Sequence, residues 1–178
     1  GYLVRLAERG VPTVPTALVE RGTAVDLASL LADHGWSDCV IKPAVSAGSW
    51  RTLRVTDDVD AGQAHLSGLL QDRDALVQPY IAGVDARGER ALVHIDGEYS
   101  HAVRKSPRFA GQDESVVLCD TVEEERALAR QVLETLPSGW LYARVDVAPG
   151  PERALLVELE ALDLSLLLNH HLPALHRL

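Results

Sequence analysis

The residues with the clearest potential for chemistry are four charged side chains near the C-terminal end of the chain. In the segment RVDVAPGPERALLVELE, Asp146 follows Arg144 by two residues, and Glu158 and Glu160 are also two residues apart. Side chains two apart on a β-strand point to the same face of the sheet. Two strands joined by the turn PGP would therefore gather three carboxylates and one guanidinium wherever their faces coincide.

Carboxylates that converge in this way repel one another unless a cation joins them. Anionic oxygen ligands suit Mg²⁺, which often also binds the phosphate groups of a substrate. The hairpin therefore favours a magnesium site next to a phosphate. The alternative is a solvated strand face that carries an ordinary ion pair between arginine and glutamate.

Two lysines stand where they could contact phosphate as point charges. Lys42 closes the apolar run CVIKP, and Lys105 closes the run HAVRK. The loop AVSAGSW follows Lys42, and in it Ser46, Gly48 and Ser49 could offer N–H and hydroxyl groups to phosphate oxygens. A strand-end lysine that reaches solvent is the alternative in both cases.

The segment LVQPYIAGVD combines an apolar strand with a following acid. Backbone groups of Gln78, Pro79, Tyr80 and Ile81 could line a pocket for adenine. Asp85 could accept hydrogen bonds from ribose hydroxyls. A core strand followed by a turn aspartate explains the same residues without a ligand.

The histidines and cysteines predict no further reaction centre. His94 alternates within a strand, and His170 and His171 have no ligand partner at a useful spacing. Cys39 and Cys119 lie in apolar settings and are expected to be inert thiols. No Ser/His/Asp or Cys/His arrangement stands out.

Helices are expected on both sides of the Lys42 segment. Asp26 can cap a helix that runs through His34, and Asp57 or Asp58 can begin a second helix that reaches about Gln71. Between these helices, CVIKP and TLRV read as strands, and ALVQPYI is the next strand.

Hairpins dominate the second half of the chain. The strands RALVHI and EYSHAVRK are joined by Asp96-Gly97, a pair typical of tight turns. SPRFAGQDES is expected to be a polar loop, and Thr121 with Glu124 forms a capping box for a helix that ends near Leu136. Hairpins separated by helices predict an α+β protein with two antiparallel sheets.

Composition excludes several classes of protein. The net charge of −9 argues against a nucleic-acid partner. No apolar run approaches the roughly 20 residues of a membrane helix, and no signal peptide is visible, so we expect a cytoplasmic protein. The chain begins with glycine and contains no methionine. We therefore expect residues to be missing at both ends.

The order of these motifs resembles that of the ATP-grasp superfamily. A strand ending in Lys-Pro precedes a small-residue flap, a hinge strand with a following acid, a basic strand, and an Arg-x-Asp strand paired with Glu-x-Glu. The motifs HAVRK and ELE are most similar to those of the glutathione-synthetase-like and ribosomal-modification-type carboxylate–amine ligases. The likeness extends from GVPTVPT to ELEALDLSLLL, almost the whole chain.

The resemblance implies an ATP-grasp fold of two lobes that grip ATP in a cleft between them. Residues 1–84 would form the small lobe with the nucleotide flap, and residues 85–178 the large lobe with the metal-binding hairpin. ATP would be held by the following residues: Lys42, Ser46, Gly48, Ser49, Gln78, Pro79, Tyr80, Ile81, Asp85 and Lys105. Magnesium, with Mn²⁺ as an alternative, would be bound by Asp146, Glu158 and Glu160.

The reaction implied is ADP-forming ligation of a carboxylic acid to an amine through an acyl phosphate. Arg144 and Lys105 would be the catalytic residues, and the partners would be small acids and amines such as amino acids or small peptides. Related ligases often form homo-oligomers, which is a further expectation here. The alternative is an ATP-binding module without ligase activity of its own.

The chain departs from the family pattern at several places. Glu160 stands where many relatives have asparagine, and Leu164 where a proline is expected. The segment around Arg108 lacks the Phe-Arg-x-Asn pattern. The resemblance implies a further domain before this region, and we expect it to be among the residues missing from this sequence.

Overall fold

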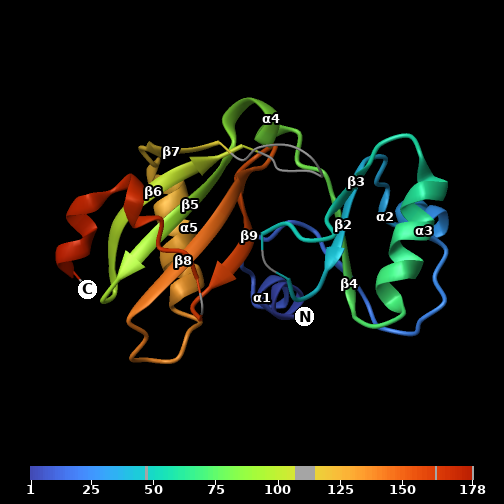
Figure 1. Cartoon of the computed structure of the whole chain (residues 1–178), viewed down its shortest axis with the longest axis horizontal. Coiled ribbons are helices and arrows are strands. Elements are labelled where there is room, and N and C mark those ends of the chain that lie inside the picture. Colours follow the sequence, from blue (N-terminus) through green and yellow to red (C-terminus); the bar gives the residue numbers. More distant parts are fainter. Residues whose placement is uncertain (47, 107–114, 163, 178) are drawn as a thin grey trace. The chain divides into compact units, whose positions relative to one another are not determined.

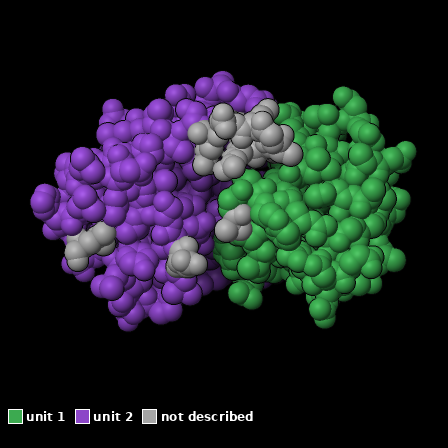
Figure 2. Space-filling view, in the orientation of Figure 1, with its two compact units in different colours: residues 1–5, 15–80, 108–113 green, residues 6–14, 81–107, 114–178 purple. Residues whose placement is uncertain are grey.

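The computed structural model describes residues 1–178 except 47, 107–114, 163 and 178. The described residues form two compact units (Figure 2), the first made of Gly1–Arg5 and Pro15–Tyr80 and the second of Leu6–Val14, 81–106 and 115–177. Each unit contains one antiparallel sheet with helices. The α+β class with two antiparallel sheets is confirmed.

The first unit is built on a four-stranded sheet (Figure 1). Its order is β1-β4-β2-β3, with strands β1 (Ala17–Val19), β2 (Cys39–Pro43), β3 (Leu53–Val55) and β4 (Ala75–Pro79). Helices α2 (Leu27–His34) and α3 (Val59–Leu70) cover it, and α1 (Tyr2–Glu8) precedes it. Along β2 the residues Cys39, Ile41 and Pro43 are buried, so the alternate position Lys42 lies on the opposite face of the sheet.

Local capping sets the helices of this unit. Asp26 Oδ1 accepts from Ser29 N at 2.7 Å, and Asp58 Oδ1 accepts from Ala61 N at 2.8 Å. Gly35 ends α2 with a φ of 68°, a left-handed conformation that glycine adopts without steric cost. Both expected N-caps are therefore confirmed.

The second unit carries a five-stranded sheet of order β7-β6-β5-β8-β9. Its strands are β5 (Glu89–Ile95), β6 (Glu98–Lys105), β7 (Val116–Cys119), β8 (Tyr142–Pro149) and β9 (Ala154–Glu160). Helix α5 (Glu123–Leu133) packs on β8 and β9, and the other helices are α4 (Gly83–Arg87) and two 3-10 helices, η1 (Leu168–His170) and η2 (Leu172–Arg177). Asp96 and Gly97, with φ of 51° and 78°, form the expected turn between β5 and β6.

The predicted lobe ranges, 1–84 and 85–178, differ from these units in two places. Residues 6–14 and 81–84 group with the second unit. The first segment does so because it pairs with the edge of the second sheet. Val14 N donates to Leu156 O at 2.9 Å, and Leu156 N donates to Pro12 O at 2.8 Å.

The start of α5 differs from the predicted capping box of Thr121 and Glu124. The helix begins at Glu123, and it is Glu125 whose side chain accepts from Val122 N, at 3.1 Å. Glu125 is buried and also pairs with Arg90 Nη1 at 2.8 Å. The carboxylate that caps the N-terminus of α5 is therefore the one that also forms an ion pair with Arg90 on β5.

Other expectations from the sequence concern the end of α5, the segment around Asp85, the loop after β6 and membrane-spanning helices. Helix α5 ends at Leu133 rather than near Leu136, and Asp85, for which a turn was the alternative interpretation, lies in helix α4. Most of the polar loop expected at 106–115, including Arg108, lies outside the described residues. No helix in the described part of the chain is both long and apolar enough to span a bilayer.

We expect Gly62→Ala to destabilise the first unit. A Cβ at Gly62 would lie 2.8 Å from side-chain atoms of Leu27 and Val55, which is an overpacked contact in the core. Such overpacking costs about 1–3 kcal/mol, measurable as a lower midpoint of urea unfolding followed by circular dichroism.

Gly68→Ala is the matched control, because it lies on the same helix and its Cβ would meet only Arg51 Nη2, at 3.5 Å. Alanine is favoured over glycine inside a helix by up to about 1 kcal/mol. This variant should be as stable as the wild type or more so. Equal destabilisation by the two substitutions would contradict the packing described for Gly62.

Candidate functional site

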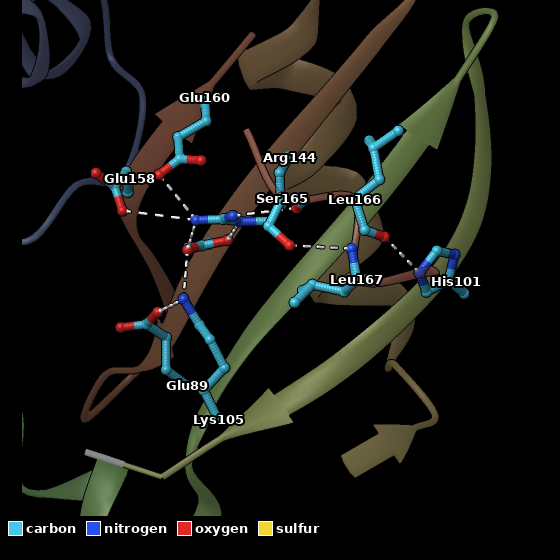
Figure 3. Close-up of polar contacts among 10 residues, drawn as sticks. Glu89, His101, Lys105, Arg144, Glu158, Glu160, Ser165, Leu166 and Leu167 are labelled. Carbon is cyan, nitrogen blue, oxygen red and sulfur yellow. Dashed lines mark hydrogen bonds and ion pairs between the residues drawn. The ribbon is translucent and has the colours of Figure 1, made fainter. Parts of the chain in front are cut away.

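The register of the last hairpin brings its charged residues together. Strands β8 and β9 pair so that Arg144 lies opposite Glu160, and Asp146 opposite Glu158. Figure 3 shows the side chains of Arg144, Glu158 and Glu160 on one face of the sheet, beside Lys105 from β6. The convergence expected from the two-residue spacing is therefore present.

Asp146 is the fully buried centre of this cluster. Its Oδ1 accepts from Arg144 Nε at 2.8 Å, and its Oδ2 accepts from Arg144 Nη2 at 3.0 Å and from Lys105 Nζ at 2.6 Å. A buried charge is tolerated only when it is paired and hydrogen-bonded. Two cations on one carboxylate meet that condition.

The pKa values in the cluster follow from this pairing. Burial alone would raise the pKa of Asp146, but the charges of Lys105 and Arg144 lower it below its ordinary value. Burial alone would lower the pKa of Lys105, whereas Asp146 and Glu89 together raise it. The pKa of Arg144 is raised in the same way by Asp146, Glu160 and Glu158, against the effect of burial. All three groups are therefore charged at neutral pH.

Glu89 is a member of the cluster that the sequence did not reveal. It lies opposite Lys105 in the pairing of β5 with β6, and its Oε1 is 2.6 Å from Lys105 Nζ. A register shift at Val93/His94 moves the later pairs by one residue. A regular hairpin counted back from the Asp96-Gly97 turn would have paired Lys105 with Gly88 instead.

Arg144 connects the three carboxylates of the hairpin. Besides Asp146, its Nη2 lies 2.9 Å from Glu160 Oε1 and 3.9 Å from Glu158 Oε2, and its Nη1 donates to Ser165 O at 3.2 Å. The side chains of Glu158 and Glu160 remain 40% and 28% exposed. Both glutamates can therefore be reached from solvent, whereas Asp146 cannot.

The donor set fits Mg²⁺ in its chemistry, because it consists of anionic oxygens. Among the described residues, however, no three acidic, histidine or cysteine side chains are already gathered as ligands of one ion. In this structure the three carboxylates are instead gathered around the Arg144 guanidinium, which forms an ion pair with each of them. The assignment of Asp146, Glu158 and Glu160 to magnesium stays a prediction.

The residues predicted to bind phosphate in the first unit lie near solvent. Lys42 is half-buried on β2, opposite Leu76, and it has no ion-pair partner in the described part of the chain. Ser46, Gly48 and Ser49 are exposed in the following loop, and Ala47 lies outside the described residues. Gly48 and Ser49 both have positive φ, 60° and 58°.

Contacts within the fold already use part of the predicted adenine segment. Gln78 is buried on β4 and its amide donates to Thr16 Oγ1 at 2.8 Å, while Tyr80 N donates to Asp38 O at 2.9 Å. The guanidinium of Arg54 lies over the Tyr80 ring, 3.4 Å from its centroid. The Tyr80 N–H is therefore not available to a ligand.

The remaining predicted residues of this segment belong to the second unit or to its border. Pro79 ends β4 in the first unit, whereas Ile81 and Asp85, the latter in helix α4, belong to the second unit. The predicted nucleotide residues are thus distributed over both units.

We expect the Asp146→Asn variant to lose stability. The substitution keeps the shape of the side chain but leaves Arg144 and Lys105 facing each other without the charge between them. Breaking a buried ion pair on one side costs about 3 kcal/mol or more, which urea unfolding at pH 7 would detect.

The difference between wild type and Asp146→Asn should also depend on pH. Because folding lowers the Asp146 pKa, the carboxylate stabilises the folded chain at pH values above its unfolded-state pKa of about 4. That contribution is lost as the pH falls through the lower folded-state value. Glu123→Gln, which removes one partner of an exposed pair with Arg130, is the control and should change little. A difference that does not shrink as the pH is lowered below the unfolded-state pKa of about 4 would contradict this account.

No family model matches the chain, but comparisons with known proteins and solved structures find similar proteins. The cycloserine biosynthesis protein DcsG of Streptomyces lavendulae is 29% identical over 184 residues, covering 93% of this chain and 62% of the relative. The crystal structure of D-cycloserine synthetase DcsG matches with a TM-score of 0.85 and 28% identity, covering 95% of this chain and 63% of that one.

More distant structures share the same architecture. D-alanine–D-alanine ligase from Bacillus anthracis, complexed with ATP, has a TM-score of 0.63 at 18% identity, covering 88% of this chain and 52% of that one. The ATP-grasp ligase PsnB, complexed with the precursor peptide PsnA2 and AMPPNP, has a TM-score of 0.64 at 18% identity, covering 95% and 52%. The chain thus spans less than two thirds of the length of these proteins. These likenesses confirm the resemblance to the ATP-grasp ligases and show that the chain has the ATP-grasp fold.

Proposed function

We propose that this chain is the ATP-using part of an ADP-forming carboxylate–amine ligase. The observation that carries the proposal is the Arg144–Asp146–Lys105 cluster, with two accessible glutamates beside it. Phosphoryl transfer depends mainly on positioning and on neutralising charge, and this cluster supplies both cations and carboxylates on one rigid sheet face.

In this proposal the carboxylates and the cations of the cluster have different roles. Glu158 and Glu160, the two accessible carboxylates, would hold magnesium, which when bound neutralises the negative charge of ATP phosphates. Asp146, the third predicted ligand, would reach the ion only by giving up part of its pairing with Arg144 and Lys105. Lys105 and Arg144 would contact the phosphoryl group as it moves from ATP to the acid. Their ion pairs with Asp146 fix both cations before any substrate arrives.

The substrate carboxylate would attack the γ-phosphorus of ATP, which forms an acyl phosphate and releases ADP. The amine would then attack the acyl carbon and release phosphate, which leaves an amide. Water would compete with the amine at the acyl carbon. A loop that closes over the site and excludes water is therefore useful, and the exposed segment around Ser46, Gly48 and Ser49 is the candidate for it.

For the nucleotide, we assign Lys42 to the phosphates and Asp85 to the ribose. Adenine would contact backbone groups between Gln78 and Ile81 other than the Tyr80 N–H, which already donates to Asp38. Residues 1–84 would act as the small lobe with the flap, and residues 85–178 as the large lobe with the metal-binding hairpin.

The substrates we propose are a small amino-acid-derived acid and a small amine. The support comes from the relatives, which include a D-cycloserine synthetase and a D-alanine–D-alanine ligase. The structure of PsnB is a complex with a precursor peptide, so peptides are the next class of substrate to test. Because the chain spans 62% of DcsG, an ATP-binding module that needs further residues for ligation is the second candidate.

We expect Mg-ATP to raise the melting temperature of this chain. A ligand at about 100 times its dissociation constant adds about 2.7 kcal/mol of stability, which corresponds to roughly 5–10 °C for a protein of this size. Glu158→Ala should reduce the rise, because it removes a predicted metal ligand. Glu152→Ala, an exposed change of the same type in the turn of the same hairpin, should not.

Phosphate release then separates the two candidate functions. Release that requires ATP, an added acid and an added amine together would support ligation by this chain. A thermal shift without any such release, over a panel of amino acids and dipeptides, would favour the binding module. The absence of any magnesium-dependent shift would count against both.

A further inference from the structure

The segment that follows β9 is held by two side chains from the face of the sheet that carries the cluster (Figure 3). Arg144 Nη1 donates to Ser165 O at 3.2 Å, and His101 Nε2 lies 3.1 Å from Leu166 O. Two consecutive carbonyl groups are therefore bound by one residue of β8 and one of β6.

The side chain of His101 is held in place for its contact with the Leu166 carbonyl. It is only 3% exposed, and it lies four residues before Lys105 on the same face of β6. Its ring stacks on His171, with centroids 4.9 Å apart, and its Nδ1 is 3.0 Å from Ser100 Oγ. The imidazole is thus fixed on three sides.

The protonation of His101 follows from its partners. A carbonyl oxygen can only accept, so Nε2 must carry the hydrogen that it donates to Leu166. Burial, followed by the neighbouring His171, lowers the pKa of His101, so the ring is neutral at neutral pH. Nδ1 is then free to accept from the Ser100 hydroxyl.

The segment needs such support because its backbone is strained. Leu167 has a φ of 55°, a left-handed conformation that is uncommon for a residue with a branched side chain. Conformations of this kind persist only where the surroundings hold them. The contacts at Ser165 and Leu166 immediately precede the strained residue.

We propose that His101 is a positioning residue for Arg144. By binding the Leu166 carbonyl, it fixes the neighbouring Ser165 carbonyl, which in turn orients the Arg144 guanidinium. The importance of this link rests on the proposed function, in which the carboxylates around Arg144 bind magnesium. A carboxylate that turns toward the ion holds the guanidinium less firmly, whereas the Ser165 carbonyl remains as a neutral acceptor.

The test is hydrogen exchange at the Arg144 Nη1–H group that donates to Ser165 O, followed by ¹⁵N NMR and assigned through its disappearance in Arg144→Lys. His101→Leu removes the donor to Leu166 and should speed exchange by up to about tenfold, the value of one hydrogen bond. His101→Gln, whose amide nitrogen can replace Nε2, should restore slow exchange. Unchanged exchange in His101→Leu would overturn the proposal.

A second pair of variants keeps the test decisive if His101→Leu fails to fold. His101→Asn places its amide near the Nδ1 position, where it cannot reach Leu166 O, whereas His101→Gln can reach it. Exchange at Arg144 should be faster in the asparagine variant than in the glutamine variant, and equal rates would refute the link. None of these measurements requires ATP, so they stand even if the thermal-shift test of the function fails.

Discussion

The buried carboxylate of Asp146 is the constraint on which the rest of the second unit depends. A fully buried charge needs partners within the fold, and it finds them in Lys105 from β6 and Arg144 from its own strand. Satisfying this one group fixes the end of β6 against β8 and the orientation of two cations. Glu160 and Glu89 then balance those cations from β9 and β5, so four strands meet at one electrostatic centre.

Much of this centre could be predicted because strand geometry is local. The two-residue spacing of Arg144 and Asp146 determines that both point to one face, whatever surrounds them. The Asp96-Gly97 turn likewise follows from the positive φ that a tight hairpin needs. Ordered motifs, taken together, then indicated the ATP-grasp fold. The fold depends on many such segments, and an error in one of them leaves the others in place.

Three of the features that escaped prediction depend on contacts between separate segments of the chain. Glu89 was missed because a bulge shifts the register of β5 against β6, and no residue type marks a bulge of this kind. The cap of α5 moved by one residue because Glu125 pairs with Arg90, 35 residues away. His101 looked like an ordinary strand residue because its partner, Leu166, lies 65 residues further along the chain.

The charge pairs within each hairpin also have a consequence for folding during synthesis. Within β5 and β6, Lys105 already faces Glu89, and within β8 and β9, Arg144 already faces Glu160. Each hairpin therefore carries its own compensated pair while it is still separate. During synthesis the first hairpin emerges from the ribosome 41 residues ahead of Asp146, with its lysine already neutralised by the local glutamate. The second hairpin carries three carboxylates and one guanidinium on this face, so its docking supplies Lys105 with a second carboxylate, Asp146.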